Sequence, residues 1–416
     1  LHGFYGTEMT HMFKSFARYA SAIVLLLSAA QLNAQDHADH GEHSTTTEET
    51  HATTEDHGHE AHAVEMHEDH GHEAAHASGG HAEEASSDDE INITDLIMHH
   101  ISDSHEWHFF DIDGHPYSLA LPIIVYTDNG VSMFSSSVFH HNDNGEVVYD
   151  AGNGDRFVKV HDHIYLASEH EHHGAYVEHG EEHEVLNAKP TLDLSITKNV
   201  INMLLGAVIM LLLFLGVTRK YDNGVPRGKA SFIEPLVVFV RDEIALQNIG
   251  KKDYQRFTPY LLTLFFFIWI NNILGLFPGG ANLTGNIAFT MTLAFLTLII
   301  VNVNGKKDYW LHILWMPGVP VWVRIMLAPI ELVGVLTKPF ALMIRLFANM
   351  TAGHIVILSL ISLTFIFKSL AIAPAAVGLT LFIYVIKVLV AFLQAYIFAL
   401  LTALFIGQAV EEHDHH

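Results

Sequence analysis

The feature that most constrains the fold of this chain is an apolar run that contains an arginine. Arg345 is followed by the apolar segment Leu346–Phe367, in which His354 is the only ionisable side chain. Such a segment is long enough to cross a bilayer, where an arginine costs several kcal/mol. Because a guanidinium keeps its proton in a protein, Arg345 is a poor proton relay and a good fixed counter-charge. The alternative is that it lies near a helix end and reaches the lipid headgroups.

Charge is distributed unevenly along the chain. The formal net charge is −25, yet no Lys or Arg occurs between Arg18 and Arg156, whereas 219–256 is rich in both. This asymmetry predicts that the two halves face opposite sides of a membrane. No basic stripe is available to neutralise phosphates, so nucleic-acid binding is not expected. The absence of cysteine excludes disulfides, thiolate metal sites and cysteine catalysis.

Residues 1–34 have the pattern of a secretory signal peptide. A basic segment, Met12–Arg18, precedes an apolar core, Ala20–Ala30, and Leu32–Ala34 approximates a small-residue cleavage site. The core is too short to span a bilayer, which favours a cleaved signal over an uncleaved anchor. The residues before Met9 or Met12 are expected to precede the true start.

Residues 35–90 consist mainly of His, Asp, Glu, Ala, Thr and Gly. Such a composition cannot bury a core and predicts disorder. The simplest interpretation is a solvated acidic spacer. Buffering of protons near a channel mouth is an alternative, since histidine titrates near neutral pH. Loose binding of Zn²⁺ or Cu²⁺ is another, with these weak candidate ligands: His57, His59, His70 and His72.

Residues 91–188 favour a small antiparallel β domain on the exported side, to which no chemistry is assigned. Five β-favouring runs are Trp107–Phe110, Tyr117–Tyr126, Val131–Phe139, Glu146–Tyr149 and Phe157–Leu166. They are separated by turn sequences typical of tight hairpins: Asp113-Gly114, Asn129-Gly130, Asn144-Gly145 and Gly152-Asn153-Gly154.

The remaining residues, 191–416, predict about five transmembrane helices, at about 200–217, 259–276, 287–303, 327–367 and 374–406. Basic residues directly after the first span place its C-terminal end in the cytoplasm. An amphipathic helix is expected at the inner surface, with one apolar face formed by Ile233, Leu236, Val237, Val240 and Ile244. The 327–367 helix would measure about 60 Å against a bilayer core of about 30 Å. It must therefore tilt, bend near Pro329 or Pro339, or lie partly in the membrane plane.

Polar residues inside these spans follow a pattern. Arg324, Glu331, Lys338 and Arg345 recur every seventh residue and share one helix stripe. Asn349 continues that face, whereas His354 lies on the opposite side. The last span holds Lys387, with Gln394 seven residues further on. A histidine-rich zinc transporter is the rival hypothesis, but it requires clustered ligands within the spans, and none is paired at helical spacing.

In combination, several motifs resemble subunit a of the rotary F-type ATP synthase. They are Arg345–His354, Glu331, Lys338-Pro339, Asn272–Pro278, Thr284–Asn286 and Leu393–Phe398. Together they cover about Thr191 to Glu412. The resemblance implies an all-α polytopic membrane domain whose last two helices form a long tilted hairpin against a ring of c subunits. It gives no counterpart for the histidine-rich N-terminal half.

The resemblance also implies roles in proton translocation. Arg345 matches the stator arginine, Asn349 the polar residue beside it, and Gln394 a nearby residue of the last helix. His354 matches the titratable position of the proton entry path. Asn272 and Asn286 match polar residues that line the same outer half-channel. Glu331 belongs to the matching set. Lys387 departs from the family, in which Glu or His is usual, and a structural or field-setting role is favoured over a relay.

The same resemblance implies partners and a location. The partners are the c-subunit ring, the b subunits of the F0 sector, the F1 sector through them, the lipid membrane and the transported protons. No cofactor is implied, and the chain is expected to be a non-catalytic subunit. The location is the bacterial inner membrane, with the N-terminal half in the periplasm and the C-terminus in the cytoplasm.

Overall fold

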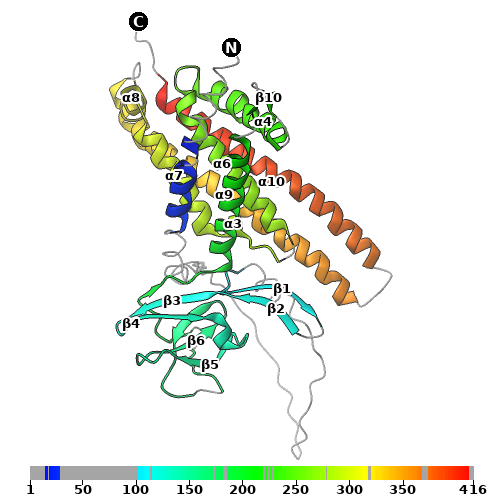
Figure 1. The fold of residues 1–416 in the computed structure, drawn as a ribbon. Helices are drawn as coiled ribbons and strands as arrows, with labels where there is room; N and C mark the ends of the chain where they lie inside the picture. Colours follow the sequence, from blue (N-terminus) through cyan, green and yellow to red (C-terminus); the bar gives the residue numbers. More distant parts are fainter. Residues whose placement is uncertain are drawn as a thin grey trace, which may run out of the picture.

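The computed structural model divides into a β-rich region and a helical region (Figure 1). It describes residues 15–16, 18–28, 102–112, 115–171, 174–180, 185–218, 221–222, 225–226, 229–277, 279–316, 320–367 and 373–411. The histidine-rich tract, with the candidate ligands His57, His59, His70 and His72, lies outside these residues, and its disorder stays a prediction.

The β-rich region is antiparallel, as predicted. β1 (Glu106–Ile112) pairs with β2 (His115–Ala120), and β3 (Pro122–Thr127) lies between β4 (Gly130–Ser135) and β8 (Leu192–Asp193). A third sheet contains β5 (Asn144–Asp150), β6 (Arg156–Val160) and β7 (His163–Leu166). β8 follows residue 188, the expected end of the β domain, yet belongs to its sheet. The buried core comprises Ile123, Val125, Phe134, Phe139, Phe157 and Ile164.

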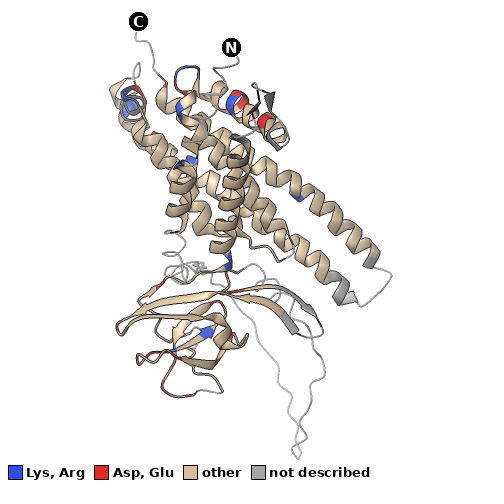
Figure 2. Cartoon of the chain, viewed as in Figure 1, with Lys and Arg blue, Asp and Glu red and all other residues tan. Residues whose placement is uncertain are grey.

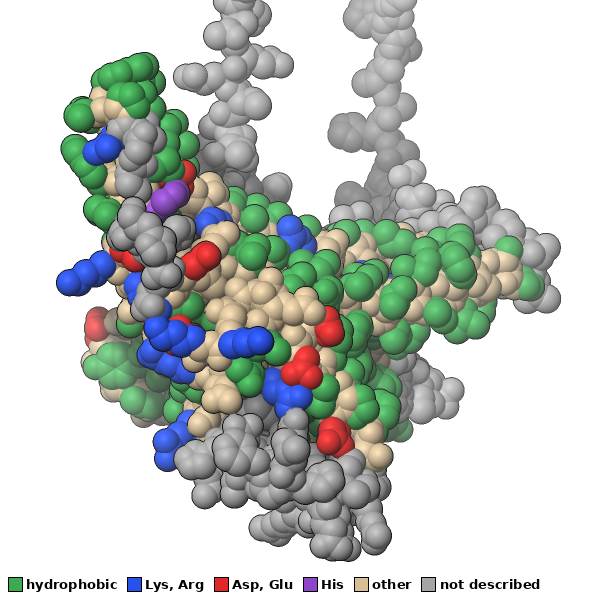
Figure 3. Space-filling view, turned by 90° about the horizontal axis from the view of Figure 1, so that it is seen from above, with side chains coloured by type: hydrophobic (Ala, Val, Ile, Leu, Met, Phe, Trp, Pro, Cys, Tyr) green, Lys and Arg blue, Asp and Glu red, His purple; other side chains and the backbone are tan. Residues whose placement is uncertain are grey.

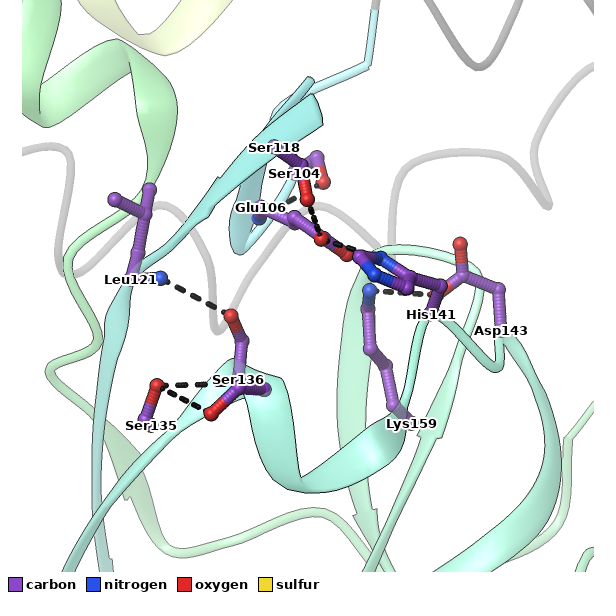
Figure 4. Close-up of polar contacts among 10 residues, drawn as sticks. Ser104, Glu106, Ser118, Leu121, Ser135, Ser136, His141, Asp143 and Lys159 are labelled. Atoms are coloured by element: carbon purple, nitrogen blue, oxygen red, sulfur yellow. Dashed lines mark hydrogen bonds and ion pairs between the residues drawn. The ribbon is translucent and has the colours of Figure 1, made fainter. Parts of the chain in front are cut away.

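Three predicted strands end earlier than their composition indicates. The run Tyr117–Tyr126 divides at Leu121, whose N–H is 3.0 Å from Ser136 Oγ and 3.3 Å from the His105 carbonyl oxygen; Figure 4 shows the Leu121–Ser136 contact. The run Val131–Phe139 becomes a 3₁₀ helix, η2 (Ser136–Phe139). The run Phe157–Leu166 is the β6–β7 hairpin, which turns at His161 with a φ of 51°.

Two of the predicted turn sequences connect strands, and one does not. Asn129-Gly130 lies at the β3–β4 turn and Gly152–Gly154 lies between β5 and β6. Asn144-Gly145 was expected to form a tight hairpin, but these residues begin β5. Gly145 has a φ of 75°, and a Cβ there would overlap the side chain of Val177, which lies outside the strands. The glycine therefore allows Val177 to pack closely against β5. Asp113-Gly114 lies outside the described residues.

All five predicted spans correspond to helices. They are α3 (Lys198–Thr218), α6 (Tyr254–Leu276), α7 (Ile287–Val303), α9 (Val321–Phe367) and α10 (Ala373–Val410). Within the described chain, four helices are long and apolar enough to span a membrane, or five if α7 forms one span with α8 (Lys307–Leu314), bent by 105°. α9 continues through Pro329 and Pro339. Figure 1 shows α9 and α10 side by side, inclined to α3 and α6.

The expected amphipathic helix is α4 (Lys229–Phe239), followed by a π-helical turn, η3 (Val240–Leu246), and α5 (Gln247–Ile249). Of the five residues predicted for the apolar face, Ile233, Val237, Val240 and Ile244 are buried and Leu236 is half-buried. Two short strands, β9 (Tyr221–Asp222) and β10 (Val225–Pro226), precede it. Lys and Arg gather at the end of the helical region where α4 and α8 lie (Figure 2). The α9–α10 hairpin, which extends beyond the other helices, is covered by hydrophobic side chains (Figure 3).

The described part of the predicted signal peptide includes an apolar helix, Arg18–Ser28, shorter than a membrane span. The Phe16 ring lies 4.1 Å from that of Phe214 in α3, and the Tyr19 ring lies 6.1 Å from that of Tyr260 in α6. This segment therefore packs on the outside of the helical bundle. Its removal by a signal peptidase stays a prediction.

Candidate functional site

Four of the predicted site residues meet at one small cavity between three helices. Its wall is formed by Asn272 of α6, Asn349 of α9, and Lys387 and Gln394 of α10, with Leu346, Met350, Val390 and Ala391. The cavity measures about 10 Å³, roughly the room that one water needs. Residues far apart in the sequence are thus brought together as the resemblance implies.

Arg345 lies one helical turn before Asn349 on α9 and is half-buried. Its Nη1 atom is fully buried without a hydrogen-bond partner, and Arg345 makes no ion pair with any residue that the structure describes. Lys338, seven residues earlier, differs because its Nζ donates to Gln408 Oε1 at 3.0 Å and lies 5.2 Å from the Phe405 ring centre. Arg345 is therefore a cation whose partner is missing from the described chain.

His354 contacts backbone carbonyl groups through both ring nitrogens. Nε2 lies 3.0 Å from the oxygen of Gly275 in α6, and Nδ1 lies 3.1 Å from the oxygen of Met350 in its own helix. A neutral imidazole has one N–H and an imidazolium has two. The neutral ring can therefore donate to only one of these carbonyl oxygens, and the protonated ring to both. This geometry suits a group that gains and loses a proton.

The two asparagines expected in the outer half-channel have different environments. Asn272 is buried; its Oδ1 accepts a hydrogen bond from Thr284 Oγ1 at 2.7 Å. Asn286 caps α7, because its Oδ1 accepts from the N–H groups of Ala288 at 2.9 Å and Phe289 at 3.3 Å. This capping role was not predicted, although asparagine directly before an apolar helical run is a typical N-cap.

Lys387 is held against α9. Its Nζ donates to the carbonyl oxygen of Asn349 at 2.8 Å, and a Cβ on Gly353 would overlap its ammonium group. The side chain thus occupies the gap left by a glycine on the facing helix. This arrangement favours the structural role over the relay.

A second, larger cavity lies nearer the N-terminal end of α9, where Glu331 is found. It measures about 340 Å³ and is lined by Asp308, Tyr309, His312, Ile313, Glu331, Val335, Lys338, Gln408 and Glu411. Sequence analysis missed Asp308 and His312, which α8 contributes. Their spacing of four residues, which places them on one face of a short helix directly after the third span, was an available signal.

Two polar regions therefore lie on either side of an intramembrane arginine that has no ion pair among the described residues. Asn272 and His354 lie on one side of it along the membrane helices and Glu331 on the other. This arrangement defines the class: a polytopic membrane protein whose apolar helices carry charged and polar side chains between their ends.

Comparisons with known proteins identify the family within that class. The model of the ATP synthase A chain family matches residues 200–407. An ATP synthase subunit a of Chloroherpeton thalassium is 48% identical over 54% of this chain and 69% of its own length. An ATP synthase subunit a of Myxococcus xanthus is 46% identical over 58% of this chain and 80% of its own length. This chain belongs to the ATP synthase subunit a family.

The β-rich region has matches of its own. A second family model, described as a domain of unknown function (DUF8433), covers residues 96–194. An ATP synthase subunit a of Anaeromyxobacter is 37% identical over 95% of this chain and 91% of its own length. The whole chain, including the β-rich region, therefore resembles a subunit a.

Proposed function

We propose that this chain is the a subunit of the F0 proton channel, in which Arg345 separates two half-channels and couples proton flow to rotation of a ring of c subunits. The observation that carries this proposal is the buried Nη1 of Arg345, which has no hydrogen-bond partner in the part of the chain that the structure describes. A buried charge without a partner is costly. A carboxylate on a passing c subunit supplies the missing partner.

The two half-channels follow from the two polar regions. The outer one contains Asn272 and His354, and the small cavity at Asn349 and Gln394 lies where it approaches Arg345. The inner one is the 340 Å³ cavity that contains Glu331 and His312. Arg345 lies between them, and its permanent charge repels a proton that would pass directly from one to the other.

Rotation follows from the changing environment of the ring carboxyl groups. In lipid such a group stays protonated, because an ionised carboxylate in hydrocarbon is costly. Beside Arg345 the opposite charge favours the ionised form. The group therefore releases its proton to one half-channel and takes up another from the second half-channel after rotation. Each proton moved through 100 mV contributes about 2.3 kcal/mol.

The exposed surface of the hairpin supports the proposed partners. Only 11% of the most apolar window of α9, and of α10, is buried inside the chain, so most of this surface is available to the c ring and to lipid. We place the subunit in the bacterial inner membrane with its C-terminus in the cytoplasm. The b subunits and the F1 sector complete the enzyme, and ATP is made in F1. The zinc-transporter alternative has no support among the relatives, which are named ATP synthase subunit a.

Arg345→Ala tests this function. We expect it to reduce coupled ATP synthesis in inverted membrane vesicles to background, a loss of about a hundredfold or more, while the complex still assembles. Arg345→Lys should restore little, because a compact ammonium does not replace a broad planar charge. The matched control is Arg324→Ala on the same helix stripe. Arg324 Nε is also buried without a hydrogen-bond partner in the described residues, but the Arg324 guanidinium lies 5.1 Å from the Trp315 ring centre, so coupling should persist in this variant. Coupled synthesis in an assembled Arg345→Ala complex would refute the proposal.

A further inference from the structure

The segment that leads into β1 joins the β-rich region to the outer end of α3. The Asp103 carboxylate accepts two hydrogen bonds, one from Thr197 Oγ1 at 3.0 Å and one from the backbone N–H of Asn199 at 3.1 Å. The Lys198 N–H in turn donates to the Ser104 carbonyl oxygen at 3.1 Å. The first turn of this membrane helix is therefore bound directly to the exported region.

β1 also contacts the loop that connects α6 to α7. Trp107 Nε1 donates to the carbonyl oxygen of Gly279 at 2.5 Å. This loop follows Gly275, whose carbonyl oxygen lies 3.0 Å from His354 Nε2. It also contains Ala281, which accepts from Asn202 of α3 at 3.4 Å. The β-rich region is thus docked on the loop that lies next to the proposed outer half-channel.

A buried cation lies beside Asp103 at the outer end of α3. Lys198 has only 8% of its surface exposed, and its charge favours the ionised carboxylate of Asp103. Beside them, Asn199 Oδ1 is buried and has no hydrogen-bond partner in the described chain. Asp103, Lys198 and Asn199 thus form a polar cluster where the β-rich region meets the outer end of α3.

We propose that the β-rich region forms the proton entrance of the outer half-channel, with Asp103 as the group that receives the proton. An external hydronium ion protonates the Asp103 carboxylate, and the acid then returns this proton to water on the His354 side, regenerating the carboxylate. Lys198 favours the ionised form and so favours release. This inference rests on the proposed function, and it gives a role to a region whose family model has none assigned.

The acid strength of Asp103 suits this exchange. Burial raises the pKa of its carboxyl group to about 6, although the Asn199 N–H, the Lys198 charge and the Thr197 hydroxyl all act to lower it. The group therefore titrates within the range of external pH. Lys198 is the charged group that faces it.

A second titratable cluster lies nearby in the β-rich region. His105 is buried, and burial lowers its pKa. Its Nε2 lies 3.8 Å from Asp193 Oδ2, and it also interacts with Asp162, His163 and Lys159. Lys159 Nζ is paired with Asp143 Oδ1 at 2.6 Å, as Figure 4 shows. Asp162 acts on Lys198 as well as on His105, so this cluster and Asp103 have Lys198 as a common neighbour. The test therefore requires a control carboxylate elsewhere in the β-rich region.

Asp103→Asn is the decisive variant, because the amide retains the shape of the side chain and an oxygen acceptor. Passive proton uptake is measured in membrane vesicles that contain the assembled F0 sector stripped of F1, with the external pH varied from about 5 to 7. In the native protein, uptake should rise as the pH falls through about 6. The variant should lose this rise, and its uptake should be lower by about tenfold. Asp103→Glu should recover most of the flux.

The matched control is Asp155→Asn. Asp155 is another buried carboxylate of the β-rich region, and its Oδ1 accepts from Asn129 Nδ2 at 2.7 Å. Proton uptake by the Asp155→Asn complex, and its dependence on pH, should equal those of the native protein. An assembled Asp103→Asn complex with native uptake and profile would show that Asp103 only caps α3, which overturns the inference. If coupling is also lost in Arg345→Ala, the proposed function stands while this inference fails.

Thr197→Val provides the test if Asp103→Asn does not assemble. It removes one hydrogen bond that stabilises the ionised carboxylate, but it keeps the carboxylate itself. The pKa of Asp103 should therefore rise, and the midpoint of proton uptake should move to higher pH. A midpoint that does not move would overturn the inference.

Discussion

α6 and the α9–α10 hairpin are both apolar, but they bury their apolar surface in different ways. Of the most apolar segment of α6, 83% is buried inside the chain, whereas only 11% of the corresponding segments of α9 and α10 is buried. α6 is the centre of the core that the chain builds for itself. The hairpin presents side chains such as Phe340, Val385 and Leu389 outward, where lipid or another subunit must cover them.

The polar residues of the two regions differ in the same way. On α6, Asn271 and Asn272 are both about 1% exposed. Asn271 Nδ2 donates to the Phe267 carbonyl oxygen and Asn272 Oδ1 accepts from Thr284 Oγ1, although Asn271 Oδ1 has no hydrogen-bond partner in the described residues. On α9, the Asn349 side chain is exposed and Arg345 lacks a partner in the described residues. Polar groups in the bundle therefore stabilise the fold, whereas those on the hairpin are available to a partner. Substitutions should separate these two roles.

The largest effect on stability is expected from a pair of helical glycines. A Cβ on Gly206 of α3 would lie less than 3.0 Å from the buried Asn271 amide, whereas a Cβ on Gly334 of α9 meets nothing within 4 Å. Gly206→Ala should destabilise the subunit by about 2 to 3 kcal/mol through overpacking. Gly334→Ala should be neutral or stabilise the helix by up to about 1 kcal/mol. The midpoint of thermal dissociation of the detergent-solubilised complex measures both, and equal midpoints would remove the contrast between bundle and hairpin.

A smaller effect should separate two asparagines of the same cavity. Asn272→Ala leaves the buried Thr284 hydroxyl without its acceptor, which should cost about 1 to 2 kcal/mol. Asn349→Ala removes an exposed side chain and should change stability by less than about 0.5 kcal/mol, while it lowers ATP-driven proton pumping. Thermal dissociation and pumping are measured on the same preparations. A destabilised Asn349→Ala variant with normal pumping would contradict the assignment of roles.

The sequence predicted the membrane helices well because apolar length alone defines a span. It did not predict the 105° bend between α7 and α8, which brings Asp308 and His312 to the inner cavity. The spacing also placed Lys338 and Arg345 on one stripe, but it did not reveal which of these two cations has a partner within the chain. Lys338 finds Gln408 on α10, and this contact depends on how the two helices pack, which no local pattern encodes.

The β-rich region was predicted less accurately because tertiary contacts override local signals there. Leu121 interrupts a continuous β-favouring run because its N–H bonds to Ser136. Gly145 follows an asparagine, as in a tight turn, but it accommodates Val177 inside a sheet. The turn at His161 has no glycine to mark it. The Asp103–Thr197 contact joins residues that the sequence separates widely, so the docking of this region on α3 was not foreseeable.

The smallest effect concerns the point where the two helices of the hairpin meet. A Cβ on Gly353 would displace the Lys387 ammonium group from the Asn349 carbonyl oxygen. Because the end of a lysine side chain moves readily, Gly353→Ala should cost only the lost hydrogen bond, about 1 kcal/mol. In a Lys387→Ala background the same substitution should cost nothing, which gives a coupling energy of about 1 kcal/mol in a double-mutant cycle. Additive effects on the thermal midpoint would show that Lys387 is not held by α9, and its role as a proton relay would then regain support.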